Sequence, residues 1–168
     1  NKNLKIEKIA RLVTYKGLIT HHLDKITKRK VLSTTHEFEY PHEFHTSLKL
    51  AGCNYDVLFV PNGYFKRHEK KFDVFLLRDH ILLETDLKCV HSCNPDTIGK
   101  RIREGSEQAS RVVLDVHADI KKTLLIDGLK LGCQRNDALT ELLLFYKAQF
   151  YRLAKSQIVS KNIYQAIK

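Results

Sequence analysis

Apolar residues recur with two different periods along the chain, and the changes of period separate predicted helices from predicted strands. Residues 41–52 carry apolar side chains at helical spacing, with proline first and glycine at the expected end, so they predict a helix. Three short apolar runs bounded by polar turns follow, which is typical of strands. These runs are residues 55–60, 73–77 and 81–88.

The second half of the chain continues this alternation. Residues 94–109 begin with a capping asparagine followed by proline, which predicts a helix, and the β-branched run 111–116 predicts a buried strand. Residues 121–133 fit either a short strand or a loop. The spacing of apolar residues by three and four over residues 136–155 predicts a long helix.

The N-terminal segment is basic and has its own pattern. Apolar residues over 4–26 lie close to helical spacing with a break near Gly17, which predicts two short basic helices. The elements together predict an α/β fold with a central, mixed, four-stranded sheet flanked by helices. We expect a basic helical arm over 1–35, the α/β domain over 36–160 and a C-terminal tail over 161–168.

Composition and charge narrow the class of protein. The 168 residues, 43% apolar and 29% charged, are enough for one domain with its own core. A net charge of +10 makes a polyanion the leading partner, with nucleic acid ahead of an anionic membrane surface or an acidic protein. No stretch of the sequence is apolar for long enough to span a membrane.

The cysteines show no regular framework, which favours free thiols; they are Cys53, Cys89, Cys93 and Cys133. Cys89, His91 and Cys93 alternate, so in an extended chain they share a face. A zinc site requires four nitrogen or sulfur ligands at recognisable spacing, and no second pair stands nearby. Zinc therefore stays a secondary alternative here.

Charged residues stand at one end of the hairpin that residues 73–88 predict. Side chains two apart on a strand share a face, so Glu84, Asp86 and Lys88 lie in one row while the residues between them face the other way and pack. Asp73 reaches the same end if the turn lies at 78–80. Such a cluster on an apolar hairpin is costly unless ions, substrate or solvent occupy it.

This cluster suits phosphodiester hydrolysis. Asp73 and Asp86 can hold Mg²⁺ or Mn²⁺ with Glu43 of the preceding helix, Zn²⁺ being an alternative, and Lys88 can orient the attacking water. The structural alternative is that the two aspartates only form salt bridges with Lys88 and Arg78 at a strand edge.

The pattern resembles a known nuclease superfamily. Asp73, twelve intervening residues and Asp86-Leu87-Lys88 resemble the motif of the PD-(D/E)XK nucleases, over about residues 41–115. More narrowly, "HEFHTSLKLAGCNYDVLFVP" and "IGKRIREGSEQASRVVLDV" are similar to the C-terminal tRNA-nuclease domains of contact-dependent growth inhibition toxins. The resemblance implies a restriction-endonuclease-like fold and a metal-dependent RNase that cuts tRNA.

The resemblance also implies a biological setting and roles for residues. Such toxins act in the bacterial cytoplasm after delivery as part of a larger secreted protein, and a cognate immunity protein, here expected to be acidic, holds them inactive. The helical acid, strand acid, metal-binding acid and lysine correspond, in that order, to Glu43, Asp73, Asp86 and Lys88. Gln108 matches a polar position on the next helix. Phe72 replaces the proline of the motif, and Cys89 follows the lysine where a small hydroxyl residue is commoner.

Basic residues near this motif are candidates for contact with RNA. They are Lys66, Arg67, Lys100 and Arg101, with Gln108 as a polar contact. Tyr64 and Phe65 could stack on an unpaired base. Three other functions stay open: a metal-independent RNase using His42 or His45, a DNA-cleaving nuclease of the same fold, and a nucleic-acid-binding module without catalysis.

Overall fold

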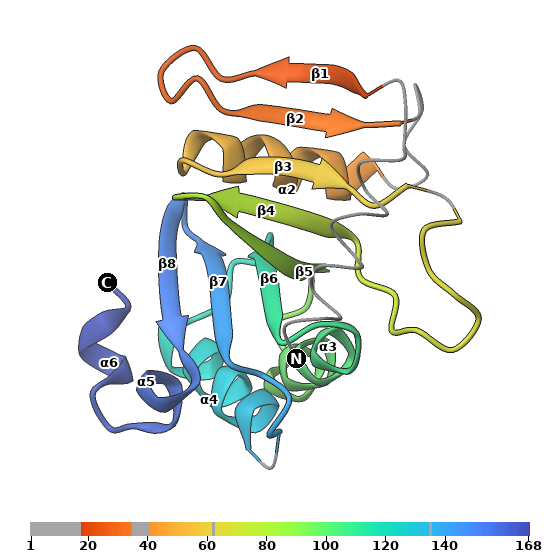
Figure 1. Ribbon diagram of the computed structural model, residues 1–168. Coiled ribbons are helices and arrows are strands. Elements are labelled where there is room, and N and C mark those ends of the chain that lie inside the picture. Colours follow the sequence, from red (N-terminus) through yellow and green to blue (C-terminus); the bar gives the residue numbers. More distant parts are fainter. Residues whose placement is uncertain (1–17, 35–40, 62, 135) are drawn as a thin grey trace. The chain divides into compact units, whose positions relative to one another are not determined.

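The computed structural model describes residues 18–34, 41–61, 63–134 and 136–168 (Figure 1). The chain forms two compact units, of which the first comprises residues 1–69 and 74–82 and the second residues 70–73 and 83–168. Helices and strands alternate through both units, so the predicted α/β class is confirmed. The prediction of a four-stranded sheet is wrong, because the described residues contain eight strands, β1 to β8.

The described part of the first unit combines short strands with the helix α2. Its elements are β1 (Ile19–Leu23), β2 (Lys30–Ser33), α2 (Pro41–Gly52), β3 (Asp56–Phe59) and β4 (Val74–Arg78). β1 pairs with β2 in antiparallel fashion, β2 pairs with β3 in parallel, and β3 pairs with β4 in antiparallel fashion. The helix and two of the strands that sequence pattern predicts in this region are therefore present.

A β-hairpin replaces the predicted helical arm in the part of the arm that the structure describes. One Asp24 carboxylate oxygen accepts hydrogen bonds from the backbone N–H groups of Ile26 and Thr27, at 2.9 and 2.7 Å, and Lys28 has a positive φ of 60°. These local bonds and this conformation make a turn where a helix would continue. The helical prediction is wrong for residues 18–33, and residues 1–17 lie outside the described part.

The second unit contains most of β5 and all the elements that follow it. They are β5 (Ile81–Val90), α3 (Pro95–Gln108), β6 (Arg111–Val116), α4 (Lys122–Cys133), β7 (Glu141–Tyr146), β8 (Gln149–Ala154), α5 (Lys155–Val159) and α6 (Ile163–Ala166). β5, β6 and β7 are parallel neighbours, and β8 is antiparallel to β7. Asn94 caps α3 as predicted, because its side chain accepts a hydrogen bond from the Asp96 N–H.

Two predictions in this unit are wrong. The expected long helix over 136–155 is the hairpin of β7 and β8, and 121–133, expected as strand or loop, contains α4. Lys147 and Ala148 both have positive φ values, 48° and 59°, which is the geometry of a two-residue hairpin turn. A continuous apolar run such as 142–146 fits a buried strand as well as a helix, so its period could not decide between them.

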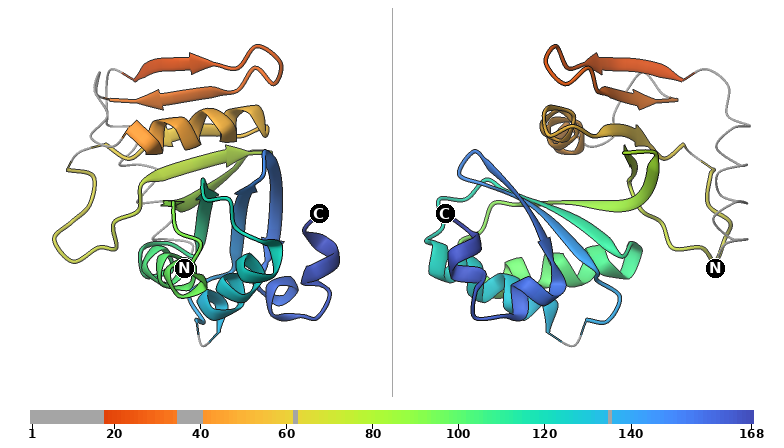
Figure 2. Two further views of the ribbon diagram at one scale, coloured as in Figure 1. Left: turned by 180° about the vertical axis from the view of Figure 1, so that it is seen from behind. Right: turned by 60° about the vertical axis from the view of Figure 1, so that its left-hand side comes forward.

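Helices cover one face of the strands in the second unit. Figure 2 shows α3 and α4 on the same side of β6 and β7. Their apolar residues form the core with Val112 and Leu114 of β6. Ile163 and Ile167, in the predicted C-terminal tail, are fully buried in this same core. None of the helices in the described segments has the length and apolar character needed to cross a membrane.

Candidate active site

Asp86 lies inside the second unit, in the middle of β5. It pairs in register with Val112 of β6, so its side chain points to the face that α3 and α4 cover, and only 1% of the residue is exposed. Thr85 and Leu87, on the opposite face, are buried as well. The alternation of residues along this strand predicts that one face packs in the core and that the other face, with Glu84, Asp86 and Lys88, does not. This prediction is wrong at Asp86, because both faces of the strand are buried there.

Lys88 lies two residues after Asp86 in β5, so the two side chains are on the same face of the strand. Its ammonium lies 2.5 Å from Oδ2 of Asp86, and 21% of its side chain is exposed. Among the described residues, Asp86 Oδ2 accepts no hydrogen bond of acceptable geometry, so the contact with Lys88 is an ion pair at an unfavourable angle. The buried Asp86 carboxylate is therefore paired with a lysine whose side chain is partly exposed to solvent.

Asp73 lies directly before β4, and its side chain reaches the backbone between Asp86 and Lys88. One of its carboxylate oxygens accepts a hydrogen bond from the backbone N–H of Leu87, at 2.7 Å. That N–H lies between Asp86 and Lys88 in the sequence, so the bond fixes the Asp73 carboxylate beside the motif. The structure thus brings together Asp73, Asp86 and Lys88, as the turn predicted at 78–80 requires.

The proximity of the two carboxylates changes the acidity of Asp86. Burial raises its pKa to about 7, and the negative charge of Asp73 is the second cause of this rise. The ammonium of Lys88 opposes part of it, and a hydrogen bond with the Asp73 side chain adds to it. Asp86 is therefore a carboxyl group that is half protonated near neutral pH in the metal-free protein.

Gly105 of α3 explains how the helix can lie so close to this carboxylate. A Cβ atom at this position would be 2.9 Å from Asp86 Oδ2 and 2.9 Å from Cγ2 of Val112, closer than such atoms approach in proteins. Every other residue would push α3 away from β5 or displace the carboxylate. The absence of a side chain at Gly105 thus allows α3 to approach β5 and β6 closely at this point.

Other predicted site residues belong to α2 and α3. Glu43 is in the first turn of α2 and is half-buried in the first unit, so its place beside Asp86 remains a prediction. Lys100 and Arg101 are exposed on α3 and both pair with Glu104, at 3.8 and 3.0 Å. Gln108 is the last residue of this helix and is half-buried.

The basic segment of the first unit is exposed, but its aromatic neighbour is not. Lys66 and Arg67 are both exposed. Tyr64 is only 1% exposed and packs edge-on against Phe75, with ring centroids 5.6 Å apart. The expectation that Tyr64 stacks on a base is therefore wrong, whereas Phe65, which is half-buried, keeps part of its surface open.

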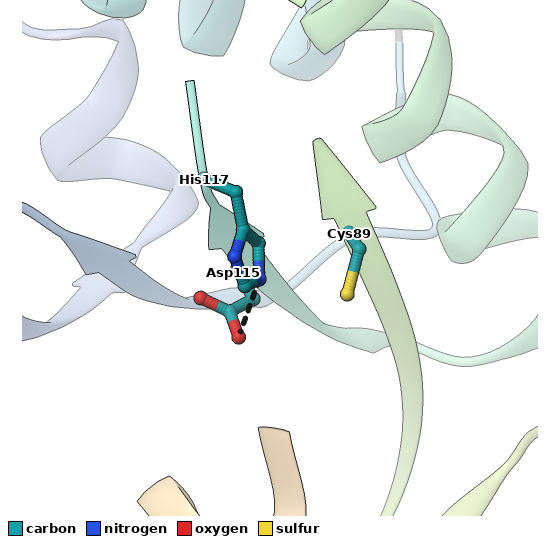
Figure 3. A group of neighbouring side chains, drawn as sticks. All are labelled: Cys89, Asp115 and His117. Carbon is teal, nitrogen blue, oxygen red and sulfur yellow. Dashed lines mark ion pairs between the residues drawn. The ribbon is translucent and has the colours of Figure 1, made fainter. Parts of the chain in front are cut away.

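A second group of metal-ligating side chains was missed by the sequence pattern. All four cysteines are free thiols, as predicted. Cys89 lies with Asp115 and His117, rather than with Cys93, whose thiol contacts the Asp119 carbonyl oxygen (Figure 3). The available signal was the spacing by two residues of Asp115 and His117 at the end of "RVVLDV", which matters only once β5 and β6 pair.

Comparison of this chain with protein-family models, with curated protein sequences and with solved structures finds no match. The proposed function therefore rests on the residues and geometry of the chain and, for its substrate, on the resemblance of its motif.

Proposed function

We propose that this chain is a metal-dependent nuclease that hydrolyses phosphodiester bonds, with tRNA as its substrate. One observation carries the proposal: Asp86 is a buried carboxylate with Asp73 beside it and the Lys88 ammonium 2.5 Å away. Two acids and a lysine at one point of a buried strand are costly to keep for stability alone. They are groups that metal-dependent phosphodiester hydrolysis can use.

The site fits a hard divalent cation. Asp73 and Asp86 offer oxygen donors, which Mg²⁺ and Mn²⁺ prefer, and Oδ2 of Asp86 accepts no hydrogen bond from any described residue. Burial and, after it, the negative charge of Asp73 raise the pKa of Asp86, and a cation would relieve the repulsion between the two carboxylates. Such an ion would supply a bound water of lowered pKa and positive charge near the scissile phosphate.

The residues of the chain have separate tasks in this proposal. Asp73 and Asp86 would hold the ion, and the hydrogen bond from Leu87 N–H would keep Asp73 in position. The Lys88 ammonium, on a side chain that is 21% exposed, would orient the attacking water and stabilise charge on the phosphate. Lys100 and Arg101, exposed on α3, would bind the nucleic-acid backbone with Gln108.

The choice of tRNA rests on the resemblance to toxin domains. Order along the chain supports it, because a helix, three strands, a helix and a strand follow one another as α2, β3, β4, β5, α3 and β6. The net charge of +10 supports a polyanionic substrate and an acidic immunity protein.

The test uses the full chain, stripped with EDTA and incubated with total tRNA or with single- and double-stranded DNA. We expect tRNA to be cut when Mg²⁺ or Mn²⁺ is added, at least about 100-fold faster than in EDTA. Lys88→Ala should remove this activity, while Lys161→Ala, which changes an exposed lysine, should leave it unchanged. Cleavage products are read on denaturing gels.

Three outcomes would contradict parts of the proposal. Cleavage that persists in EDTA would overturn the metal mechanism and favour histidine catalysis. Cleavage of DNA alone would overturn the substrate. If folded protein cuts no nucleic acid with either metal, the proposed enzyme activity is wrong.

A further inference from the structure

We propose that Cys89, Asp115 and His117 form a second metal site, which binds a transition-metal ion of the zinc class. This site is separate from the Asp73 and Asp86 site and does not depend on the nuclease proposal. It consists of one thiol, one carboxylate and one imidazole, whose ligand atoms all lie within 4.8 Å of one another. Figure 3 shows Cys89 on β5, Asp115 on β6 and His117 just beyond the end of β6, with a dashed line for the ion pair between Asp115 and His117.

Parallel pairing of β5 and β6 creates this arrangement. Cys89 is the in-register partner of Asp115, so their side chains project from the same face of the two strands. His117 follows two residues after Asp115 and therefore keeps to that face. Its backbone N–H donates to the Val90 carbonyl oxygen at 2.8 Å, which extends the pairing by one step. The backbone thus places all three groups before any ion binds.

The distances suit a tetrahedral ion. His117 Nε2 and Asp115 Oδ2 are 3.2 Å apart. Two ligands bound at about 2.0 Å from a tetrahedral zinc ion are separated by about 3.3 Å, so this pair needs almost no movement. Cys89 Sγ lies within 4.8 Å of a ligand atom of each of the other two residues, and it would have to move closer to reach a metal–sulfur distance of about 2.3 Å.

The types of ligand select the metal. A thiol with an imidazole favours zinc and similar transition ions over Mg²⁺ and Mn²⁺, which prefer oxygen donors. Asp115 is 1% exposed, whereas 36% of the His117 side chain is exposed, so an ion can enter from the histidine side. The His91 ring stacks on His117 at a centroid distance of 4.9 Å and restricts its orientation.

The new site and the nuclease site lie on opposite faces of β5. Asp86 and Lys88 share one face, and Cys89 faces the other way. An ion at Cys89 would add a link between the ends of two parallel strands, beside their backbone pairing and the connection through α3. It would stabilise the folded second unit, because the ligands are brought together only when the strands pair.

Cobalt is the probe that tests this site. The full chain, freed of metal with EDTA and desalted, is titrated with Co²⁺, and a thiolate-to-cobalt charge-transfer band is recorded in the near ultraviolet. We expect the band to saturate at one thiolate-bound ion per chain and to be absent in Cys89→Ser. Cys93→Ser removes an exposed thiol four residues further on and should keep the full band. A band that survives Cys89→Ser, or none in the unmodified chain, overturns the proposal.

A second readout covers variants that fold poorly. Zn²⁺ should raise the unfolding temperature of the unmodified chain, with an affinity that His117→Gln lowers at least about 100-fold, more than the loss usual for an outer-shell residue. His68→Gln, at an exposed histidine of the first unit, is the matched control. Asp86→Asn should keep the cobalt band, so that a failed nuclease site and a failed zinc-class site give different results. Equal Zn²⁺ affinity in His117→Gln and in the unmodified chain would contradict the site.

Discussion

Replacing Asp86 by asparagine is expected to abolish metal-dependent cleavage and, at the same time, to make the metal-free protein more stable above neutral pH. The loss of activity should be at least about 10³-fold, because a metal-binding carboxylate supplies several kcal/mol of transition-state stabilisation. The gain in stability follows from burial, since Asp86 is 1% exposed and its ionised form has Asp73 as a close neighbour. A residue kept only for stability would not show this combination.

The sign of the pH dependence follows from the direction of the pKa shift. The folded protein holds the Asp86 proton up to about pH 7, whereas the unfolded chain loses it near pH 4. The stabilising contribution of the protonated carboxyl is therefore complete below about pH 4 and is lost as the pH rises toward 7. This loss is about 4 kcal/mol as an upper bound, and Asp86→Asn should recover about 1–3 kcal/mol at pH 8.5 and almost nothing at pH 4.

Denaturant unfolding in EDTA at a series of pH values measures this prediction, and the tRNA assay measures the activity. Asp137→Asn removes an exposed carboxylate and should change neither quantity, because solvent already screens that charge. If Asp86→Asn were less stable than the unmodified chain at pH 8.5, the carboxylate would be a structural partner of Lys88. The salt-bridge alternative would then be favoured.

Replacing Gly132 by alanine is expected to destabilise the second unit by about 2 kcal/mol or more, although alanine is the better helix former by about 1 kcal/mol. A Cβ atom on this residue of α4 would lie 2.6 Å from Cβ of Ile102 in α3. That atom is fixed to the backbone of a fully buried residue, so no rotation of a side chain can relieve the clash. The two helices would have to separate and leave poorly packed core behind.

Asp127→Ala is the matched control, because it lies at an exposed position of the same helix and gains the same helix former. Its stability should stay within about 0.5 kcal/mol of the unmodified chain. Hydrogen exchange of amides in α3 and α4, measured with denaturant unfolding, would place the loss in these helices. A Gly132→Ala protein as stable as the Asp127→Ala protein would show that α3 and α4 do not pack at the distance described.

The part of the site that could be predicted follows from local rules. Side chains two residues apart on a strand share a face, so Asp86 and Lys88 lie on the same face of β5 whatever its position in the sheet. Asp79 and His80 both have positive φ values, 51° and 62°, which makes a two-residue turn. Counting six residues back and six residues forward from that turn leads to Asp73 and Asp86, so the approach of the two carboxylates was contained in the spacing.

The incorrect secondary-structure predictions concern segments in which the spacing of apolar residues does not indicate the element that forms. Residues 142–146 are apolar without a break, and such a run is compatible both with a buried helix and with a strand that is buried on both faces. Only the parallel partner β6 and the turn at Lys147 and Ala148 make it a strand. Gly128 and Gly132 of α4 have low helix propensity. They occur in this helix at the positions where residues of α3 pack too closely for a Cβ atom.

The sequence by itself determined the α/β class, the hairpin that carries Asp73, Asp86 and Lys88, and the basic surface, because each depends on residues close together in the chain or on composition. Only the tertiary structure decided that α3 buries the Asp86 carboxylate, and that Cys89 meets Asp115 and His117. Both outcomes depend on the pairing of β5 with β6 across an intervening helix. Register between strands so far apart is set by the packing of the whole core, which no local spacing records.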